Sequence, residues 1–283
     1  MRFWRRSASL QLGNNRYSLD DLTFTFKVRV EDRPKVGIAE ISVTNLAPTT
    51  RAALEKGMPV ILNAGYQGDV GLIFAGNIAE FSHDYGETDT VTKITAADAM
   101  DAWLAGQVNK TYKPGITARE VLDDLLVIFG VEVALAQLAV NKTYPRGRVC
   151  RGKLKDVLKE IVVSDCGSRL MIRNGQIIIS PPDEGIATGY HLTPETGLLK
   201  DTEKMETRET AADDTIPDPK TSTEQKEADG GMKVSCLLNY HIGCVDIVVI
   251  EDSEMSGQFM VKALTHEGSL TGQWKSILEV QPS

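Results

Sequence analysis

Apolar and polar residues alternate strictly between Asp21 and Val30, which is the clearest pattern in the chain. Successive side chains of a β-strand point to opposite faces, so this stretch is predicted to be a strand with one buried and one wet face. The stretch Gly37–Leu46 alternates in the same way, and apolar runs at Met58–Gly65 and Gly71–Phe81 follow it closely. Together these stretches predict the strands of one compact unit.

A short helix is predicted between the second and third of these strands. Pro48 suits the first turn of a helix because its missing N–H would be unpaired there, and Gly57 suits a left-handed exit. The Thr-rich stretch Glu87–Thr95 predicts a further strand, and Ala96–Leu104, which contains Trp103, predicts a second short helix. Residues 15–95 are therefore expected to form a small antiparallel barrel or sandwich.

The middle of the chain changes to a helical period. Thr117, with Glu120 three residues later, matches the capping box that begins a helix, and apolar residues then recur at helical spacing. The stretch Lys153–Val163 carries a second apolar stripe. Asn174 and Gly175 between two apolar runs are the strongest short-range signal for a hairpin. A small α+β unit is predicted.

The word NKTY occurs twice in this middle region, each time followed by a glycine three residues later. The two copies are Asn109–Gly115 and Asn141–Gly147, which lie 32 residues apart, and each stands ahead of a predicted helix. This indicates an internal repeat. Both copies also match the acceptor pattern for N-glycosylation, but that match has no meaning in a cytoplasmic protein.

Strand patterns return after residue 230. Met232–Leu238 and Gln258–His266 alternate, Cys244–Ile250 is a nearly continuous apolar run, and Trp274–Val280 places its apolar residues on one face. These stretches resemble those of the N-terminal region. The chain is therefore predicted to be α+β and mostly β, with two similar β-units flanking an α+β insertion.

Composition and charge exclude several classes of protein. The 283 residues, 42% of them hydrophobic, can bury a real core in two or three units. The net charge is −8, but ten acidic and four basic residues within Asp201–Gly230 account for −6 of it. The rest is nearly balanced, which removes the argument for a basic nucleic-acid-binding surface. The stretch Glu209–Gly230 is expected to be a polar insertion or loop.

The sequence shows no pattern of a segment that directs a protein to a membrane. No apolar run follows the basic residues of Met1–Leu10, and no stretch approaches the roughly 20 apolar residues of a membrane span. A protein folded in a cytoplasm is expected. The four cysteines are expected to be reduced thiols, because a chain this long lacks the cysteine density of a secreted scaffold.

Cys236, His241 and Cys244 are residue types that bind zinc and are the candidates for a metal site. Their spacing matches no complete four-ligand pattern. Cys236 also falls in phase with the apolar residues Val234 and Leu238, as a buried structural cysteine does. A structural role is therefore the favoured interpretation, and no metal ligand is predicted.

Two adjacent pairs of histidine and carboxylate are candidates for acid–base chemistry, His83 with Asp84 and His266 with Glu267. Neighbours on a strand point to opposite faces, so neither pair forms a dyad by itself. We interpret these residues as turn and edge positions.

Gly65, Gly68 and Gly71 resemble a phosphate-binding loop only loosely. They join a strand to a strand and offer no helix N-terminus to an anion, so a hairpin loop is the favoured interpretation. No catalytic, cofactor-binding or metal-binding residue is predicted, no cofactor is expected, and the protein is not expected to be an enzyme.

Three groups of residues give the chain a family resemblance that spans nearly its whole length. They are the block Asn45–Gly76, the segment Leu237–Gly243, and the terminal motif of His266, Gly268, Gly272 and Trp274. With them the chain resembles the baseplate hub proteins of long-tailed bacteriophages and phage-like particles.

The resemblance implies a domain arrangement. It implies a tail-tube-like β-barrel at 1–104, an α+β insertion domain at 105–183, and a second tail-tube-like barrel at 184–283. Three subunits of that family form a pseudo-sixfold ring of six barrels that docks on a sixfold tail tube. The long acidic loop at 203–230 departs from the family, in which a shorter connection is expected.

The resemblance also implies partners and a location. The expected partners are two further copies in a homotrimer, the tail tube or distal tail protein, the central spike protein and the tape-measure protein. DNA passes through the ring without specific binding, no membrane is involved, and the expected place is the virion tail baseplate after assembly in the host cytoplasm. Two alternatives remain, a sixfold distal-tail ring protein and a baseplate cell-wall hydrolase. The hydrolase would need convergent carboxylates or a nucleophile–base pair, which the sequence does not assemble.

Two expectations concern assembly. Open strand edges need a partner, so Asp21–Val30 and Gly243–Ile250 are expected to join subunits through an interface of roughly 2,000 Å² or more. Replacement of Thr25 by proline is then expected to prevent ring formation. The acidic stretch Asp201–Gly230 would repel DNA if it faced the lumen, so neutralising Asp213, Asp214 and Asp218 would slow DNA ejection; an outer-surface loop is the other interpretation.

Overall fold

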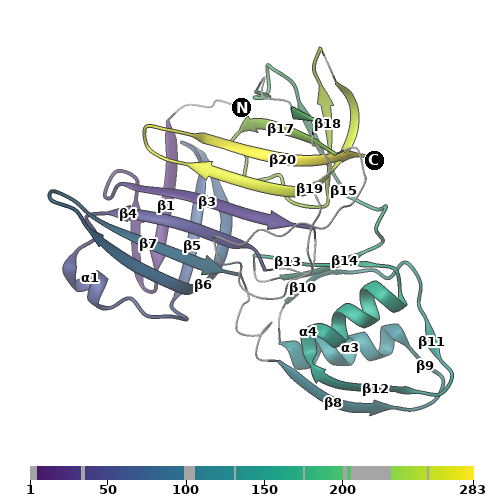
Figure 1. Cartoon of the computed structure of the whole chain (residues 1–283). Helices are drawn as coiled ribbons and strands as arrows, with labels where there is room; N and C mark the ends of the chain where they lie inside the picture. The colour runs from purple at the N-terminus through teal and green to yellow at the C-terminus, as the bar shows by residue number, and fades with distance from the viewer. Residues whose placement is uncertain are drawn as a thin grey trace.

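A computed structural model describes residues 5–32, 36–98, 106–130, 132–174, 176–199, 203–204, 231–253 and 255–283. Most of these residues lie in β-strands, and the longer helices are gathered in the middle of the chain (Figure 1). This agrees with the expected mostly β, α+β class. Among the described residues, no helix is both long enough and apolar enough to cross a membrane.

Among the described residues, the N-terminal part has seven strands and one short helix. They are β1 (Arg6–Leu12), β2 (Asn15–Ser18), β3 (Phe24–Glu31), β4 (Ile38–Thr44), α1 (Pro48–Ala52), β5 (Pro59–Tyr66), β6 (Asp69–Tyr85) and β7 (Thr90–Ala97). We call this set the N-terminal β-unit.

The C-terminal part consists of six strands, which we call the C-terminal β-unit. They are β15 (Ile186–Leu192), β16 (Glu203–Lys204), β17 (Met232–Leu237), β18 (Asp246–Glu251), β19 (Ser256–Gly268) and β20 (Trp274–Pro282).

All thirteen strands of these two units belong to one continuous sheet. Its main order is β16-β17-β20-β19-β3-β4-β7-β6-β5-β1-β2, with β18 paired to β19 and β15 paired to β18. The two units are joined where β19 pairs antiparallel with β3, from Ala263 opposite Glu31 to Gly268 opposite Phe26. Figure 1 shows β19 and β20 running alongside β3 and β4, while β1 and β5 cross them steeply.

The two β-units have the same strand order. The order β3-β4-β7-β6-β5-β1 of the first corresponds to β16-β17-β20-β19-β18-β15 of the second, and the strands follow one another along the chain in the same sequence. One orientation differs, since β1 runs antiparallel to β5 while β15 runs parallel to β18. The similarity of the two units that the sequence patterns indicate is therefore present in their connectivity.

Closed barrels were expected, and none is found among the described residues. The strand order does not return on itself, because β2 and β16 stand at its two ends. The long strand β6 instead pairs with β5 through its first half and with β7 through its second half, so it carries the sheet from one direction into the other. The N-terminal β-unit is an open, folded sheet.

The two strands expected to join subunits are interior strands, which corrects that expectation. β3 pairs with β4 on one edge and β19 on the other, and β18 pairs with β15 and β19. The reason is that the chain supplies both partners itself. Thr25 lies opposite Ser42 of β4, so a Thr25→Pro substitution would disturb an internal ladder and does not test how subunits join.

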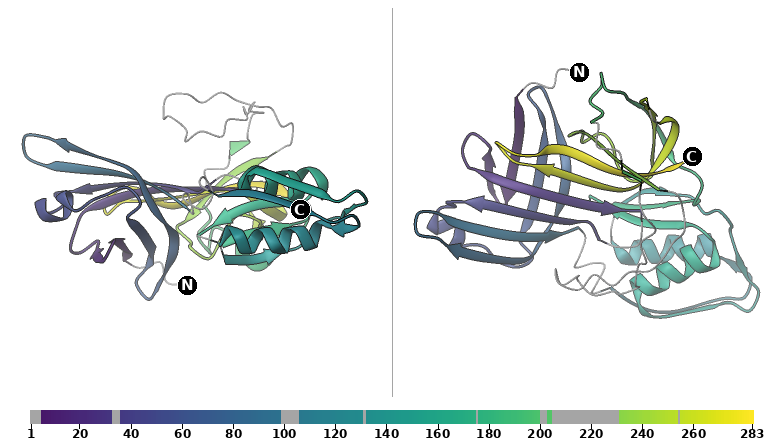
Figure 2. Two further views of the ribbon diagram at one scale, coloured as in Figure 1. Left: turned by 90° about the horizontal axis from the view of Figure 1, so that it is seen from below. Right: turned by 45° about the horizontal axis from the view of Figure 1, so that its top comes forward.

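The middle of the chain forms a separate α+β layer. Its elements are β8 (Gln107–Tyr112), β9 (Ile116–Thr117), α3 (Ala118–Phe129), β10 (Glu132–Ala136), β11 (Thr143–Tyr144), β12 (Arg148–Lys153), α4 (Leu154–Lys159), the π-helical turn η1 (Glu160–Asp165), β13 (Arg169–Arg173) and β14 (Gln176–Ser180). In Figure 2, left panel, α3 and α4 lie at one end of the molecule and the N-terminal strands at the other.

The three-stranded sheet β10-β14-β13 holds this layer against the large sheet. Leu170, Ile172 and Ile177 face the helices and belong to their core. Met171 and Ile178, one residue out of phase, belong to the core of the large sheet. Because successive strand side chains point to opposite faces, one short hairpin contributes to both cores. The middle layer is therefore packed onto the β-units and is not a loose appendage.

The predicted helix and hairpin signals of the middle layer are confirmed. Thr117 and Glu120 form the capping box of α3, and Gly130 ends that helix in the left-handed conformation. The helix expected at Lys153–Val163 is α4 continued by η1, so it reaches Asp165. β13 and β14 pair antiparallel, with Arg173 opposite Gln176.

Other boundaries differ from the prediction. α1 ends at Ala52, well before Gly57, although Gly57 does adopt a positive φ of 85°. Ala96 and Ala97, predicted to begin a helix, are the last residues of β7. The rest of that predicted helix, including Trp103, lies largely outside the described residues. The acidic stretch also lies outside them, apart from the short strand β16.

The two NKTY copies make the same kind of contact, in which the lysine and the tyrosine both bind one carboxylate. In the first copy Lys110 Nζ and Tyr112 Oη donate to the carboxylate of Asp124 on α3, at 2.8 and 2.6 Å. In the second copy Lys142 Nζ and Tyr144 Oη donate to Asp165 at the end of η1, at 2.5 and 2.8 Å. Lys110 and Tyr112, two residues apart in β8, lie on one face of that strand and so reach one carboxylate; Lys142 just precedes β11, which contains Tyr144. The repeat is structural.

Asp165, the carboxylate of the second cluster, is more buried than Asp124, the carboxylate of the first. The Asp165 side chain is 11% exposed and also accepts from Arg148 Nη1 at 2.8 Å. Burial works against its charge, but hydrogen bonds from Lys142 and Tyr144 and the charge of Arg148 lower the pKa of Asp165. A carboxylate with a lowered pKa stabilises the fold above its unfolded pKa, and the effect is lost as the pH falls through its folded value.

We predict that Asp165→Asn lowers the free energy of unfolding by about 2–4 kcal/mol at pH 7, because three donors lose their anionic acceptor. The deficit is expected to vanish as the pH falls well below 4, where the native carboxylate is protonated too. Urea unfolding from pH 3 to pH 8 measures it. The control is Asp123→Asn, which removes an exposed partner of Arg119 and is expected to change stability by no more than about 0.5 kcal/mol. A loss that stayed constant with pH would contradict the electrostatic explanation.

Candidate functional site

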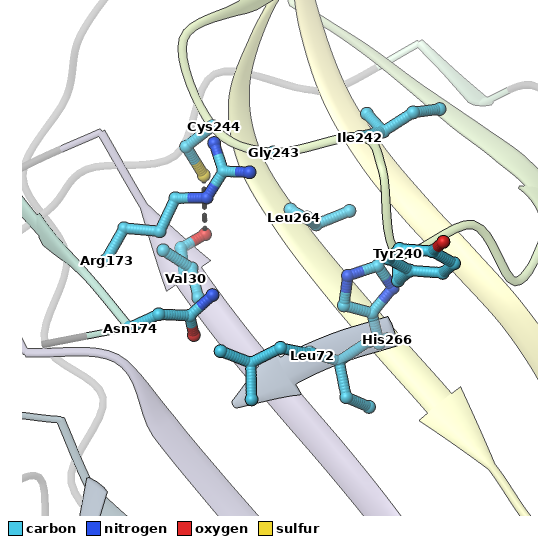
Figure 3. Close-up of a pocket in the computed structure, with 11 residues that line it drawn as sticks. Val30, Leu72, Arg173, Asn174, Tyr240, Ile242, Gly243, Cys244, Leu264 and His266 are labelled. Carbon is cyan, nitrogen blue, oxygen red and sulfur yellow. Dashed lines mark hydrogen bonds between the residues drawn. The ribbon is translucent and has the colours of Figure 1, made fainter. Parts of the chain in front are cut away.

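The N-terminal unit, the C-terminal unit and the middle layer meet at one place, which we call the three-way junction. Its lining comes from all three parts of the chain (Figure 3): Val30, Leu72, Ile73, Arg173, Asn174, Tyr240, Ile242, Gly243, Cys244, Leu264 and His266. The hollow between them has a volume of about 20 Å³, which is room for about one water molecule. A substrate pocket is typically more than ten times larger, so this is a packed joint.

An ion pair ties the middle layer to the C-terminal unit at this junction. Arg173 Nη1 on β13 lies 3.8 Å from Asp246 Oδ1 at the start of β18, and the Gly243 N–H donates to Asp246 Oδ2 at 2.6 Å. Asp246 is 2% exposed. Burial raises the pKa of Asp246, while Arg173 and the Gly243 N–H act in the opposite direction. The carboxylate therefore depends on Arg173 as its cationic partner.

Gly243 is required beside that ion pair. A Cβ at this position would fall on the guanidinium of Arg173, and Figure 3 shows the two residues side by side. The next residue, Cys244, donates from Sγ to the Val30 carbonyl at 3.2 Å, and burial raises the pKa of its thiol. This thiol therefore stays protonated and links the C-terminal unit to β3.

His266 lies on β19 within the same junction and is 3% exposed. Its Nδ1 is 2.8 Å from Ser276 Oγ, and that hydroxyl accepts from the Asn239 N–H at 3.0 Å. Burial, with a smaller contribution from Arg173, lowers the pKa of His266 to about 3. The imidazole is therefore neutral at physiological pH, and its role here is a satisfied hydrogen bond in a buried joint.

A second ionic cluster spans all three parts of the chain. Asp32, which follows β3, forms ion pairs with Arg169 of β13 and Lys262 of β19, with Oδ2 at 3.4 Å from Arg169 Nε and from Lys262 Nζ. Arg169 Nη2 also lies 3.3 Å from Met260 Sδ. One carboxylate of the N-terminal unit thus pairs with a cation from each of the other two parts, which fixes their relative placement.

The terminal motif that carries the family resemblance lies at the β3–β19 contact. A Cβ at Gly268 would overlap the ring of Phe26, which packs edge-on against Trp274 at a centroid distance of 5.6 Å. The turn that contains Gly272 accepts three hydrogen bonds from Arg6 Nη1 of β1, at 2.8–3.2 Å. Gly268, Trp274 and the turn of Gly272 thus take part in contacts between the two β-units, whereas His266 bonds to Ser276 within the C-terminal unit.

The glycine-rich stretch of the N-terminal unit joins the same contact region. Tyr66 lies opposite Asp69, so the stretch is a hairpin turn between β5 and β6, as predicted. Asp69 Oδ1 accepts from Tyr240 Oη at 2.8 Å and lies 3.2 Å from His241 Nε2. A Cβ at Gly71 would overlap the Tyr240 ring. The hairpin tip docks on the segment before β18.

The three candidate zinc ligands each have a separate partner. His241 faces Asp69, Cys244 faces Val30, and Cys236, whose pKa burial raises to about 12, interacts with Ser276. No group of three His, Cys, Asp or Glu side chains in the described part of the chain is arranged to hold a metal ion. All four cysteines are free and buried, as expected for reduced thiols.

The two histidine–carboxylate pairs occupy matching places in the two β-units. His83 Nδ1 lies 3.1 Å from Thr92 Oγ1 of the next strand, as His266 does from Ser276. Asp84 pairs with Lys93 at 3.7 Å, and Glu267 pairs with Lys27 at 3.1 Å. Neither histidine contacts its neighbouring carboxylate in these pairings. Both pairs lie inside strands, and His266 and Glu267 are paired on both edges by β3 and β20, so the interpretation as turn and edge positions is wrong for that pair.

Comparisons with known proteins find likeness in structure alone. No family model matches the chain, and no curated protein matches its sequence. The 43 kDa tail protein of prophage MuSo2 from Shewanella oneidensis has a TM-score of 0.66 at 12% identity, over 98% of each chain. A tail protein from Neisseria meningitidis has a TM-score of 0.66 at 8% identity, over 99% of this chain and 97% of that one.

A third similar structure comes from a secretion machine. The Escherichia coli c3393 protein, a type VI secretion component with structural similarity to the T4 phage tail proteins gp27 and gp5, has a TM-score of 0.62 at 9% identity. The match covers 97% of this chain and 76% of that one. The chain therefore has the fold of phage tail proteins and of a related secretion component.

We predict that Arg173→Met lowers the free energy of unfolding by about 2–3 kcal/mol at pH 8, because it leaves the buried Asp246 carboxylate without its cation. The raised pKa of Asp246 gives the sign of the pH effect: the penalty exists above the folded pKa and shrinks as falling pH protonates the acid. Urea unfolding at pH 8 and pH 5 measures the change.

Two further variants isolate the interaction. In an Asp246→Asn background, Arg173→Met is expected to cost clearly less than it does alone, which a double-mutant cycle reports. Lys93→Met removes the cation of an exposed pair, with side chains 61% and 71% exposed, and is expected to change stability by at most about 1 kcal/mol. Equal costs of Arg173→Met in both backgrounds would contradict the assignment.

Proposed function

We propose that this protein is a structural component of a phage tail or phage-like particle, the baseplate hub that joins the tail tube to the central spike. Three copies form a homotrimeric ring in which each copy contributes two β-units. The six units match a sixfold tube, so the hub adapts sixfold symmetry to threefold symmetry. Its role is mechanical, and no step of chemistry is assigned to it.

The observation that carries this proposal is the same strand order occurring twice in one chain. Two β-units with matching order, held side by side by the β3–β19 pairing, are what a threefold ring needs to present six similar positions. The fold likeness to phage tail proteins, matched over at least 97% of their solved chains, supports a place in a tail. The packed junction supports a structural role, because its hollow of about 20 Å³ leaves no room for a substrate.

The proposal includes the neighbours of the ring. The tail tube or distal tail protein contacts one face, the central spike protein contacts the other, and the tape-measure protein ends in the lumen. DNA passes through without specific binding, in agreement with a chain of net charge −8. The domain limits 1–104, 105–183 and 184–283 belong to this proposal, and its location is the baseplate of the virion.

A sixfold distal-tail ring is the alternative within the same structural class. The doubled strand order favours the threefold ring, since six copies would bring twelve β-units to a sixfold tube.

We predict that the purified chain assembles into a trimer of about 93 kDa, three times the 31.0 kDa of one chain. Native mass spectrometry and sedimentation at several protein concentrations measure this mass. A stable species of about 186 kDa would support the distal-tail ring instead. A chain that remained a 31.0 kDa monomer at every concentration would contradict both assemblies.

A further inference from the structure

The second half of β6 has one edge without a strand partner among the described residues. β6 pairs with β5 from Asp69 to Asn77, and Ile78 still exchanges a hydrogen bond with Met58. From Asn77 to Tyr85 it pairs with β7 on its other edge. Beyond Ile78, the edge that faced β5 is open. An unpaired edge is a template for another strand.

The C-terminal unit contains the same arrangement with the edge filled. β19 pairs with β18 as far as Val261, whose carbonyl accepts from the Val245 N–H, and then the same edge pairs with β3 from Lys262 onward. Its other edge pairs with β20 throughout. The strand β3 therefore occupies on β19 the position that is open on β6.

The strands β6 and β19 correspond residue by residue. The ladder of β6 with β7 skips Ala79, and the ladder of β19 with β20 skips Lys262, so each strand has a bulge where its other edge changes partner. Counted from the bulge, His83 of β6 corresponds to His266 of β19. His83 lies opposite Thr92, and His266 lies opposite Ser276. Both histidines contact those hydroxyls through Nδ1.

The two histidines differ in burial because β3 lies beside His266, whereas among the described residues no strand lies beside His83 on the corresponding edge. His266 is buried beside β3, whereas His83 is only half-buried and Tyr85, two residues on, is 70% exposed. Phe81, His83 and Tyr85 lie in a row along one face of β6, with ring centroids 5.7 and 6.3 Å apart. Phe81 and His83 are half-buried and Tyr85 is exposed, with Arg51 of α1 over one face of its ring. An aromatic row that becomes exposed along an unpaired strand edge is typical of a surface that a partner covers.

The backbone groups of this row point to the open edge. The Gly86 N–H donates to Asp89 in the turn, so Gly86 faces the β7 side. Backbone groups alternate between the two edges along a strand. The N–H groups of Asp84 and Ser82 therefore face β7, and those of Phe81, His83 and Tyr85 face the open edge.

We infer that the open edge of β6 pairs with the C-terminal β-unit of a second copy of this chain, as β19 pairs with β3 within one copy. This inference rests on the proposed ring and names the surface that closes it. The internal joint consists of β19 and β3, and their counterparts are β6 and β16. Among the described residues β6 has the open edge, and β16, described over Glu203–Lys204, stands at one end of the sheet, so one copy presents both halves of a second joint.

The two halves belong to different β-units of the chain and are different strands, so the contact is head to tail. A head-to-tail contact forms a ring when its rotation closes, as in the proposed trimer, and an open filament when it does not. Because it copies the internal joint, each added copy contributes two further β-units in the same relative orientation.

The test compares His83→Pro with His83→Ala in the full-length chain. Both variants lose the imidazole and its contact with Thr92, but only proline removes the outward N–H and places a ring on the open edge. We expect His83→Pro to require at least about tenfold more protein for self-association than His83→Ala, as measured by sedimentation, which corresponds to about 1.4 kcal/mol. Circular dichroism confirms that both variants are folded.

Self-association of folded His83→Pro at the same concentration as His83→Ala would overturn the inference while leaving the ring proposal standing. A wild-type chain that stays monomeric would overturn both. Hydrogen exchange on the wild-type protein gives an answer even if the proline variant does not fold. The amides of Phe81, His83 and Tyr85 are expected to be protected in the assembly and to exchange fast after dilution to monomer; fast exchange in the assembly would overturn the inference.

Discussion

The pairing of β19 with β3 is the interaction on which the rest of the structure depends. It turns two sets of strands into one sheet and fixes their spacing and angle. The residues around the β19–β3 pairing pack in close contact. Gly268 admits the Phe26 ring, Trp274 packs against that ring, and the neutral His266 is satisfied by Ser276. A buried ladder lined by such contacts holds two units more rigidly than a linker can.

The middle layer stabilises that joint from one side. Its hairpin β13–β14 contributes side chains to two cores, and its cations Arg169 and Arg173 pair with Asp32 of the N-terminal unit and Asp246 of the C-terminal unit. Removing one partner of such a pair leaves a buried charge, so the three parts are coupled. The repeated lysine–tyrosine clamps keep the helices of this layer in place. The architecture therefore favours a rigid body.

Local patterns predict the elements of this fold well and their pairing poorly. The alternation at β3, the capping box of α3 and the turn at Asn174 are set by neighbours in sequence, and the structure confirms them. Alternation cannot distinguish an interior strand from an edge strand, which is why β3 and β18 were wrongly expected to be open. The strand β15, parallel to β18, has no regular alternation to reveal it. The junction residues were visible only as a motif, because their contacts span more than 200 positions.

The proposed ring rests on a doubled strand order, one internal joint and one open counterpart of that joint. The most direct test is an electron cryomicroscopy map of the purified assembly. The account predicts that one-sixth of a turn about the ring axis brings the β19–β3 joint of one copy onto a joint between copies that involves β6. A ring whose copies meet through α3 and α4, with β6 left exposed, would contradict it.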